Sequence, residues 1–276
     1  SGTVWLGAGD GLWRLARDGL SKVALPFATA EDADRPEVEA LLLDQNSRLW
    51  IGTRRGAFIY NRARKTVVER LDHDPGDRQS LGSSRVTTLA QGADGVIWVG
   101  TWIGGLSSHD PRAASLRTLK RRRDEVNSLP ADPVVAIEPS PDGTLWLAMG
   151  ESAGLVRVDP RGAVLERHTY RSDSETGLSS DYLLSLARDR DGRLWIGSGD
   201  RGLDRLDPET GLIERFGSAG KGFPGTTVRA LLITQSGDLV VGTLGEGLIE
   251  RCASCTSFVQ HRPGQGPGRL PDARVT

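Results

Sequence analysis

The strongest constraint on the fold is a motif that recurs at a nearly constant interval. Its best copy, DRDGRLWIGSGDRGLDRLD from Asp189 to Asp207, joins an Asp-Gly turn, an alternating apolar segment, a Gly-rich turn and a second alternating segment. The repeats are centred on Trp5, Trp50, Trp98, Trp146, Trp195 and Val240. The steps between these positions are 45 to 49 residues, which indicates a repeat architecture.

Each repeat predicts four antiparallel strands joined by tight turns. In the best copy they cover residues 182–187, 194–197, 202–206 and 212–216, whereas the first copy has no strand before Trp5. A four-stranded meander cannot bury both of its faces alone, and radial stacking of the copies solves this problem. A parallel solenoid would need shorter repeats, of about 20 to 30 residues. The sequence therefore predicts an all-β fold, a β-propeller of four-stranded antiparallel blades, with six blades in this chain.

The two ends of the sequence leave the closure of the propeller open. Because the chain begins inside a repeat, we expect residues 1–276 to form a single β-propeller domain that is a fragment of a longer protein. The last residues, DARVT from Asp272 to Thr276, match the SSRVT that opens a strand at Ser83. They can supply the strand that the first blade lacks. Equally, they can start a further blade, and the chain is then part of a seven-bladed or double propeller.

The overall charge excludes one class of partner. The 276 residues carry a formal net charge of -1, so no global field attracts nucleic acid, and we expect no nucleic-acid partner. No apolar run reaches the roughly 18 residues of a membrane span. We therefore expect attachment to a membrane only through a segment outside this sequence.

The repeated string resembles a known family. The pattern D-x-D-G-x-L-W-I-G-T-x-x-G-G-L, with G-L-S-S before it at Gly177 to Ser180 and D-P-x-T-G after it, is similar to the two-component-regulator propeller repeat over nearly the whole chain. The resemblance implies a bacterial, periplasmic sensor region, joined in the full protein to a membrane helix and to a histidine kinase or diguanylate cyclase. Members of this family usually carry two propellers of seven blades.

The resemblance also implies the function that we expect. The chain would be an extracytoplasmic ligand-sensing module of a signal-transduction protein, without enzymatic activity of its own. A small molecule, oligosaccharide or peptide would change the packing of the propeller and bias a dimeric full-length protein between two states. The alternatives are a protein-protein interaction scaffold and a propeller lyase of the streptogramin-lyase type.

The candidate binding site follows from the expected topology. In each blade, the loops between the second and third strands emerge on the same face as the connections to the next blade, and both vary between copies. The first set offers Arg54, Arg55, Trp102, Glu151, Asp200, Arg201 and Glu246, and the second set offers Arg85, Asp181, Tyr182 and Arg229. Trp102 is an extra aromatic residue in its turn, and it suits either stacking on a sugar or peptide ring or packing on an adjacent loop. The repeated tryptophans of the motif are instead expected to pack between blades.

No catalytic residue is set up by spacing. The four histidines, His73, His109, His168 and His261, are scattered over predicted strand ends and turns, and no serine lies in a GxSxG elbow. A lyase or hydrolase would need an acid and a base within hydrogen-bond reach, and the sequence offers no such pair.

Two other patterns favour structural explanations. Asp189, Asp191 and Gly192 resemble the start of a calcium loop, but an EF-hand has its glycine at the sixth position and helices on both sides. A hairpin turn explains the pattern better, so we predict no metal and no cofactor. The run KRRR from Lys120 to Arg123 could hold an anionic ligand. Asp124 and Glu125 follow directly, which favours a solvated loop.

The two cysteines form a CxxC at the tip of a predicted hairpin. The spacing of Cys252 and Cys255 fits a redox pair, half of a zinc site or a small structural disulfide. A second pair of metal ligands and a thioredoxin-like context are missing, which favours a disulfide or two unreactive thiols. An oxidised pair would indicate a location outside the cytosol.

Overall fold

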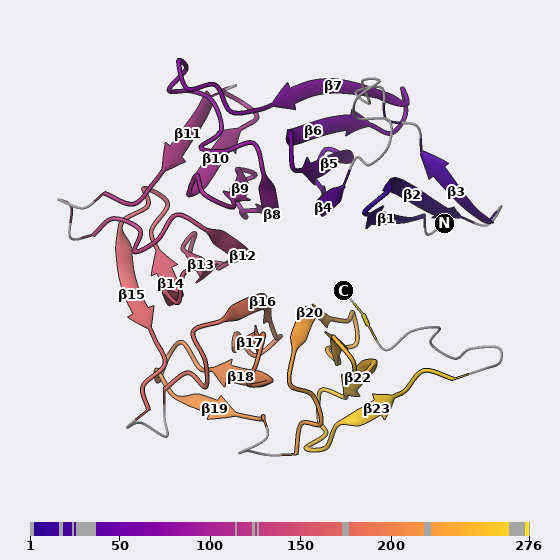
Figure 1. Cartoon of the computed structure of the whole chain (residues 1–276), viewed down its shortest axis with the longest axis vertical. Helices are drawn as coiled ribbons and strands as arrows, with labels where there is room; N and C mark the ends of the chain where they lie inside the picture. The colour runs from indigo at the N-terminus through magenta and orange to yellow at the C-terminus, as the bar shows by residue number, and fades with distance from the viewer. Residues whose placement is uncertain are drawn as a thin grey trace. The chain divides into compact units, whose positions relative to one another are not determined.

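The fold consists of β-sheets that follow one another along the chain (Figure 1). The computed structural model describes residues 3–16, 19–23, 25, 37–113, 115–122, 125, 127–172, 177–217, 222–264 and 274–275. Within these residues all regular elements are strands, and the fold is an all-β propeller with six blades. Over the same residues, no helix has the length and hydropathy that would be needed to cross a bilayer.

The sheets contain the strands in chain order. The first has three strands, β1 (Val4–Ala8), β2 (Gly11–Ala16) and β3 (Gly19–Val23). The second has β4 (Val38–Leu43), β5 (Arg48–Thr53), β6 (Gly56–Asn61) and β7 (Thr66–Leu71), and the third has β8 (Val86–Gln91), β9 (Ile97–Thr101), β10 (Leu106–Asp110) and β11 (Ser115–Leu119). The fourth has β12 (Val134–Pro139), β13 (Leu145–Met149), β14 (Gly154–Val158) and β15 (Val164–His168). The fifth has β16 (Leu183–Arg188), β17 (Leu194–Ser198), β18 (Leu203–Leu206) and β19 (Ile213–Arg215), and the sixth has β20 (Val228–Ile233), β21 (Leu239–Thr243), β22 (Leu248–Arg251) and β23 (Val259–His261).

The predicted blades are confirmed. The four strands expected between residues 182 and 216 are β16 to β19, and the first sheet begins without the strand that its sequence copy lacks. The chain divides into two compact units. Unit 1 comprises Ser1–Leu145 and Val158–Val164, and unit 2 comprises Trp146–Arg157 and Leu165–Thr276. That residues 1–276 behave as a single domain stays a prediction.

The Asp-Gly turn and the tryptophan of the motif are bonded to each other. Asp189 Oδ1 accepts the backbone N–H groups of Asp191 and Arg193, which closes the turn, and Asp189 Oδ2 accepts the indole N–H of Trp195 at 3.2 Å. The corresponding carboxylate in the second sheet, Asp44, accepts the indole N–H of Trp50 at 3.0 Å. A buried indole N–H needs an acceptor, so the aspartate serves both the turn and the core.

The repeated tryptophans pack between sheets, as the sequence predicts. Trp50 is fully buried and belongs to a cluster with Ile97 and Val99 of the next sheet, whose β8 contacts β4 and β5. In unit 2, Trp195 packs with Leu239 and with other residues of the sixth sheet. Burial of a large apolar surface joins the successive blades at these two interfaces.

Glycines in the second strand of a blade allow the next sheet to approach closely. A Cβ atom at Gly52 would lie 2.7 Å from Val86 Cγ1, and one at Gly197 would lie 2.4 Å from Val228 Cγ1. The C-terminal segment repeats this contact, since Val275 Cγ1 lies 3.0 Å from a Cβ at Gly242 and its N–H donates to the carbonyl of Thr243.

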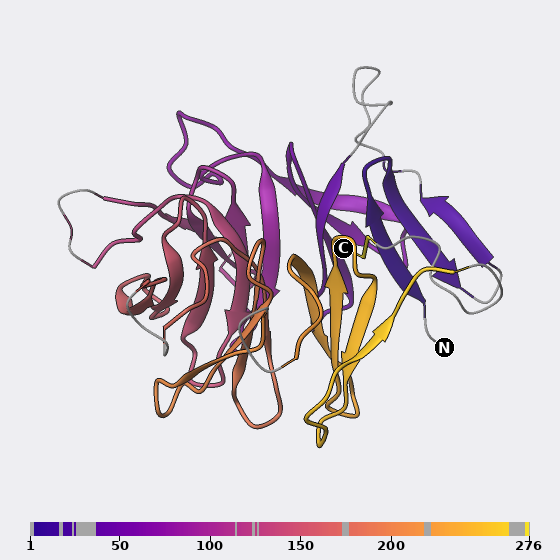
Figure 2. The same cartoon turned by 60° about the horizontal axis from the view of Figure 1, so that its bottom comes forward.

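The predicted role of the DARVT tail is therefore met in part. Figure 2 shows the C-terminal residues beside one end of the sixth sheet. There Arg274 forms an isolated antiparallel β-bridge with Leu244. Val275 occupies the position of a residue that opens the first strand of a following blade. Asp272, Ala273 and Thr276 lie outside the described residues, and the closure of six blades stays a prediction.

Candidate functional site

The two sets of loops that carry the predicted site meet at the same end of each sheet. In the third sheet, the N–H of Trp102 donates to the carbonyl of Arg85 at 3.0 Å, which joins the loop after β9 to the segment before β8. In the fifth sheet, Gly199 donates to Tyr182 in the same way at 2.8 Å. The loops therefore share one end of the sheet in each unit, as the topology predicts.

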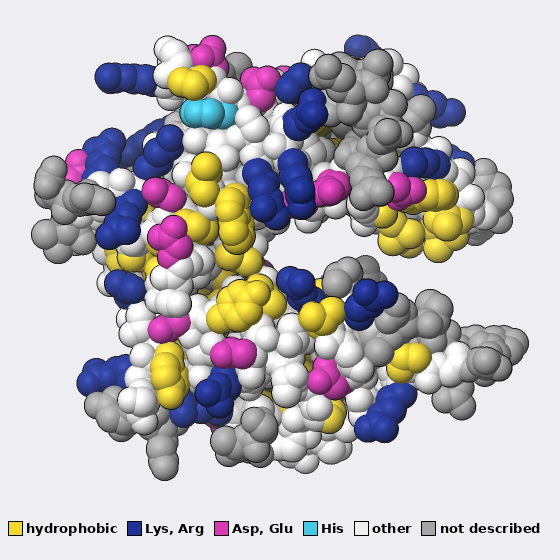
Figure 3. All heavy atoms as spheres, viewed as in Figure 1, with side chains coloured by type: hydrophobic (Ala, Val, Ile, Leu, Met, Phe, Trp, Pro, Cys, Tyr) yellow, Lys and Arg dark blue, Asp and Glu magenta, His cyan; other side chains and the backbone are white. Residues whose placement is uncertain are grey.

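In unit 1 these loops and Glu39 of β4 form a group that we name the aromatic shelf, comprising Trp102, Ile103, Arg85, Arg54 and Glu39. The side chains of Trp102 and Ile103 are 46% and 65% exposed. The guanidinium carbon of Arg85 lies 4.8 Å from the centroid of the Trp102 ring, a cation-π contact. In Figure 3, hydrophobic side chains are exposed in the region of β8 and β12, with Lys and Arg side chains beside them.

Glu39 holds the shelf together from the neighbouring blade. The Nε of Arg85 lies 3.1 Å from both carboxylate oxygens of Glu39, and the Nε of Arg54 lies 3.0 Å from one of them. Arg54 also pairs with Glu37 at 2.6 Å. The hydrogen bond to Glu39 and the charge of Glu37 raise the pKa of Arg54 above its ordinary value. The carboxylates orient both arginines, and almost half of the Trp102 side chain stays exposed.

Glu37 and Glu39 were not among the predicted site residues. The signal that could have found them is the repeat itself, because Glu39 lies 46 residues before Arg85 and therefore at a similar height in the adjacent blade. Arg55, which was predicted, makes contacts outside the shelf: its N–H donates to Thr53 Oγ1 and its carbonyl accepts from Arg70.

In unit 2 the structure brings together Tyr182, Asp200 and Arg201. The Tyr182 ring lies over Gly199, since a Cβ there would be 2.2 Å from a ring carbon, and the side chain is 57% exposed. Asp200 and Arg201 follow Gly199 and form a weak ion pair at 4.0 Å. Here the aromatic residue stands where unit 1 has Arg85, so the two units present different surfaces from the same backbone positions.

The other predicted residues of unit 2 hold loops or lie apart. Asp181 Oδ1 accepts the N–H of Tyr170, and Glu246 Oε1 accepts the hydroxyl of Thr226 at 3.2 Å. Glu151 lies in a turn at φ 54°, and Arg229 is exposed on β20. We assign Asp181 and Glu246 to the support of loop structure rather than to ligand binding.

A buried carboxylate fixes the connection before the fifth sheet. Asp204 of β18 is 2% exposed, and its Oδ2 accepts the N–H and the hydroxyl of Ser179 at 2.8 and 2.9 Å. Burial raises its pKa to about 6, although the bonds from Ser179 favour the charged form. Ser179 belongs to the GLSS motif, so this contact explains why a polar residue is tolerated at a core position.

The histidines do not form an acid-base site with the shelf. His168 Nε2 lies 2.7 Å from Glu166, and both residues are on β15, the last strand of the fourth sheet. His261 Nε2 on β23 lies 3.1 Å from Glu250 on β22. His109 is buried against Trp50, and burial lowers its pKa. His73 Nδ1 contacts the carbonyl of Leu81. Among the described residues, no group of three or more His, Cys, Asp and Glu side chains could hold a metal ion.

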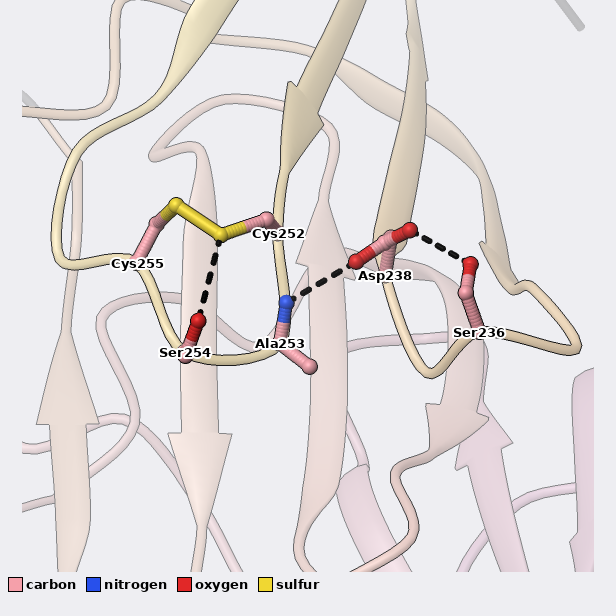
Figure 4. Close-up of a disulfide and its surroundings, with 6 residues drawn as sticks. All are labelled: Ser236, Asp238, Cys252, Ala253, Ser254 and Cys255. Atoms are coloured by element: carbon pink, nitrogen blue, oxygen red, sulfur yellow. Dashed lines mark hydrogen bonds between the residues drawn. A yellow bond between two sulfur atoms is a disulfide. The ribbon is translucent and has the colours of Figure 1, made fainter.

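The two cysteines form a disulfide in the turn between β22 and β23 (Figure 4). The N–H of Cys255 donates to the carbonyl of Cys252, so the bond spans a tight turn, and the Cα atoms are 5.1 Å apart. The adjacent Ala253 N–H donates to Asp238, which is itself bonded to Ser236 of the neighbouring turn. The disulfide thus closes one turn of the sixth sheet, and the hydrogen bond from Ala253 to Asp238 links that turn to the neighbouring one.

These features define a repeat propeller that carries variable loops at one end of its sheets. Residues 80–103 and 177–200 match the family model described as two component regulator propeller. Among curated proteins, no sequence matches the chain significantly.

Solved structures share the fold. The extracellular domain of a protein described as a hybrid two component system, BT4673, from B. thetaiotaomicron superimposes with a TM-score of 0.73 at 20% identity, over 99% of this chain and 34% of that chain. Virginiamycin B lyase from Staphylococcus aureus superimposes with a TM-score of 0.68 at 14% identity, over 96% of this chain and 82% of that one. The chain thus spans about a third of the length of the first structure.

Proposed function

We propose that the chain is the extracytoplasmic, periplasmic ligand-sensing propeller of a bacterial signal-transduction protein, and that it is not itself an enzyme. The family repeats and the likeness in fold to the extracellular domain of a two component system support this proposal. Fold alone does not give function, so the site carries the rest of the argument.

The observation that carries the proposal is the aromatic shelf. A half-exposed indole beside the Arg85 guanidinium, which the Glu39 carboxylate holds in place, offers stacking and directional hydrogen bonds to one ligand. Such a surface suits a small molecule, an oligosaccharide or a peptide with a flat apolar face. The site is built for recognition, since the shelf pairs no histidine with a carboxylate.

The proposed ligand acts through the equilibrium between two states of the full-length protein, which we expect to be a dimer. A ligand can shift that equilibrium only by its difference in affinity for the two states. The shelf joins residues of two adjacent blades, so a ligand bound there contacts both and favours one arrangement of the pair.

A thermal-shift screen with oligosaccharides, peptides and small acids tests the proposal. A ligand at a hundred times its Kd adds about 2.7 kcal/mol to stability and raises the Tm. We expect that shift to be lost in Trp102→Ala and Arg85→Ala and kept in Leu212→Ala, which truncates an exposed side chain in the turn between β18 and β19. No shift with any compound would contradict ligand sensing by this chain and favour a scaffold.

The non-catalytic part of the proposal has a separate test. Incubation of the chain with a streptogramin, followed by mass spectrometry, should return the compound unchanged. Turnover would contradict the proposal and favour a lyase, whose fold the chain resembles.

A further inference from the structure

Two residues of the KRRR run, Lys120 and Arg122, line a cavity that the sequence alone does not reveal. The cavity has a volume of about 400 Å³ and lies in unit 1, between the end of β11 with its following loop and the turn at residues 159–163. Lys120 and Arg122 come from the run, and Arg117 of β11 and Arg161 of the turn join them. Two of the four basic side chains are thus brought in by the fold.

The cavity carries a positive charge that the described residues compensate only in part. Its lining includes four basic side chains and one carboxylate, Glu125, which forms an ion pair with Arg122 at 2.6 Å. Arg117 and Lys120 donate to neutral backbone carbonyls, Arg117 to that of Arg161 at 3.1 Å and Lys120 to that of Gly82 at 3.3 Å. These bonds hold the cations in place without neutralising them. The excess is local, because the whole chain has a net charge of -1.

The described residues of the loop beside the cavity are held by hydrogen bonds. Ser128 Oγ donates to the carbonyl of Arg122 at 2.7 Å and accepts its N–H at 3.1 Å, and Asn127 accepts the N–H of Val164. Leu129 of the same loop is buried and anchors it. A framework fixed before binding lowers the entropy that a ligand must overcome.

We propose that this cavity binds a ligand that carries sulfate or phosphate groups. Guanidinium groups present paired donors that match tetrahedral oxyanions, and a lysine adds a point charge. Leu119 and Leu129 in the lining give an apolar wall for the carbon skeleton that bears the anion. The volume lies in the range of small-ligand sites. This site shares no residue with the aromatic shelf. The proposal for the cavity therefore does not depend on whether the shelf binds a ligand.

The test compares wild type with Arg117→Gln/Arg161→Gln. The probes are inorganic sulfate, inorganic phosphate, glucose 6-sulfate, glucose 6-phosphate and glucose, with sodium chloride added to keep the ionic strength constant. Affinity is measured by calorimetry and by the shift in Tm. We expect binding of the anionic probes, with affinity at least tenfold weaker in the double variant, and no binding of glucose. The sulfate and phosphate arms identify which group is preferred.

Two controls separate specific binding from general salt effects. Sulfate and phosphate stabilise most proteins by exclusion from the surface, so the readout is the difference between variants. Arg64→Gln/Arg262→Gln removes two exposed cations elsewhere and should bind like wild type. Arg117→Lys/Arg161→Lys keeps the charge and should retain part of the affinity. Equal responses of wild type and the Gln double variant, or binding of none of the four anionic probes, would overturn the proposal.

Discussion

Among single residues, Asp204 has the clearest consequence for stability. Its pKa is raised to about 6 from 3.8 because burial disfavours the charged form. From about pH 4 to about pH 6 the folded state keeps a proton that the unfolded state has released, so the free energy of unfolding falls as pH rises through this window. Asp204→Asn removes the effect, and we expect its stability relative to wild type to increase by about 2 to 3 kcal/mol across the window.

Urea denaturation at four pH values between about 4 and 7 measures this difference. Asp200→Asn, at an exposed site in the same sheet, is the control and should follow wild type at every pH. Parallel pH profiles of wild type and Asp204→Asn would contradict the assignment of the shift to this carboxylate.

Two tryptophans of the chain should differ sharply in their contribution to stability. Trp102 is almost half exposed, whereas Trp50 is fully buried between two sheets. We expect Trp102→Ala to lower the free energy of unfolding by less than about 1 kcal/mol and Trp50→Ala by about 3 to 5 kcal/mol. Denaturant titration of both variants checks this, and a loss of several kcal/mol in Trp102→Ala would make it a core residue instead.

The residues of the aromatic shelf differ in how readily the sequence alone identifies them. Trp102 could be picked out because it is an extra aromatic residue in its turn, and Arg85 because it lies in a variable connection between blades. Glu39 was missed because a glutamate in a strand is ordinarily solvent-facing, although the repeat spacing places it in the blade adjacent to Arg85. Its importance depends on packing between adjacent blades, which places Arg85 beside it. The cavity at Arg117 and Arg161 was missed for the same reason.

At the scale of strands, the close approach of glycine and valine sets the distance between neighbouring sheets. A Cβ at Gly100 would lie 2.5 Å from Thr88 and 3.0 Å from Val134 of the next sheet. Gly100→Val therefore forces the sheets apart, and overpacking of this kind costs about 1 to 3 kcal/mol. A matched control is Gly9→Ala, where a Cβ meets nothing within 4 Å.

Thermal denaturation of the two variants gives the test. We expect a lower Tm for Gly100→Val and a Tm close to that of wild type for Gly9→Ala. A Gly100→Val variant as stable as wild type would show that the sheets adjust to the larger side chain without cost.

Most elements could be predicted from the sequence because the repeat supplies several copies of the same evidence. The strands expected at residues 194–197 and 202–206, for example, are β17 at Leu194–Ser198 and β18 at Leu203–Leu206. The last strands of the fifth and sixth sheets are shorter than their apolar patterns, since edge strands end where pairing stops. The state of the cysteine pair had to be left open, because spacing alone does not fix whether two thiols in a turn are bonded.

Across the whole molecule, one scaffold presents different chemistry at equivalent positions. At the end of each of four sheets, two loop residues meet. These pairs are Glu37 with Arg54, Arg85 with Trp102, Tyr182 with Gly199, and Thr227 with Leu244. The glycines, tryptophans and Asp-Gly turns stay similar because the packing between blades depends on them. Variation is thus confined to residues that carry no such packing, which is the pattern of binding loops on a rigid framework.

The C-terminal segment gives a prediction about the integrity of the last blade. Val275 packs on Gly242 and donates its N–H to Thr243, which caps the second strand of the sixth sheet. Deletion of residues 272–276 removes this contact, and we expect the free energy of unfolding to fall by about 1 kcal/mol. Hydrogen exchange measured by mass spectrometry should show the loss of protection in β20 and β21. Arg274→Ala, which keeps the backbone bond and the valine, should leave protection unchanged. If β20 and β21 were as protected in the truncated chain as in the full chain, the sixth sheet would be complete without the segment. The match between DARVT and the start of a strand would then have no structural role.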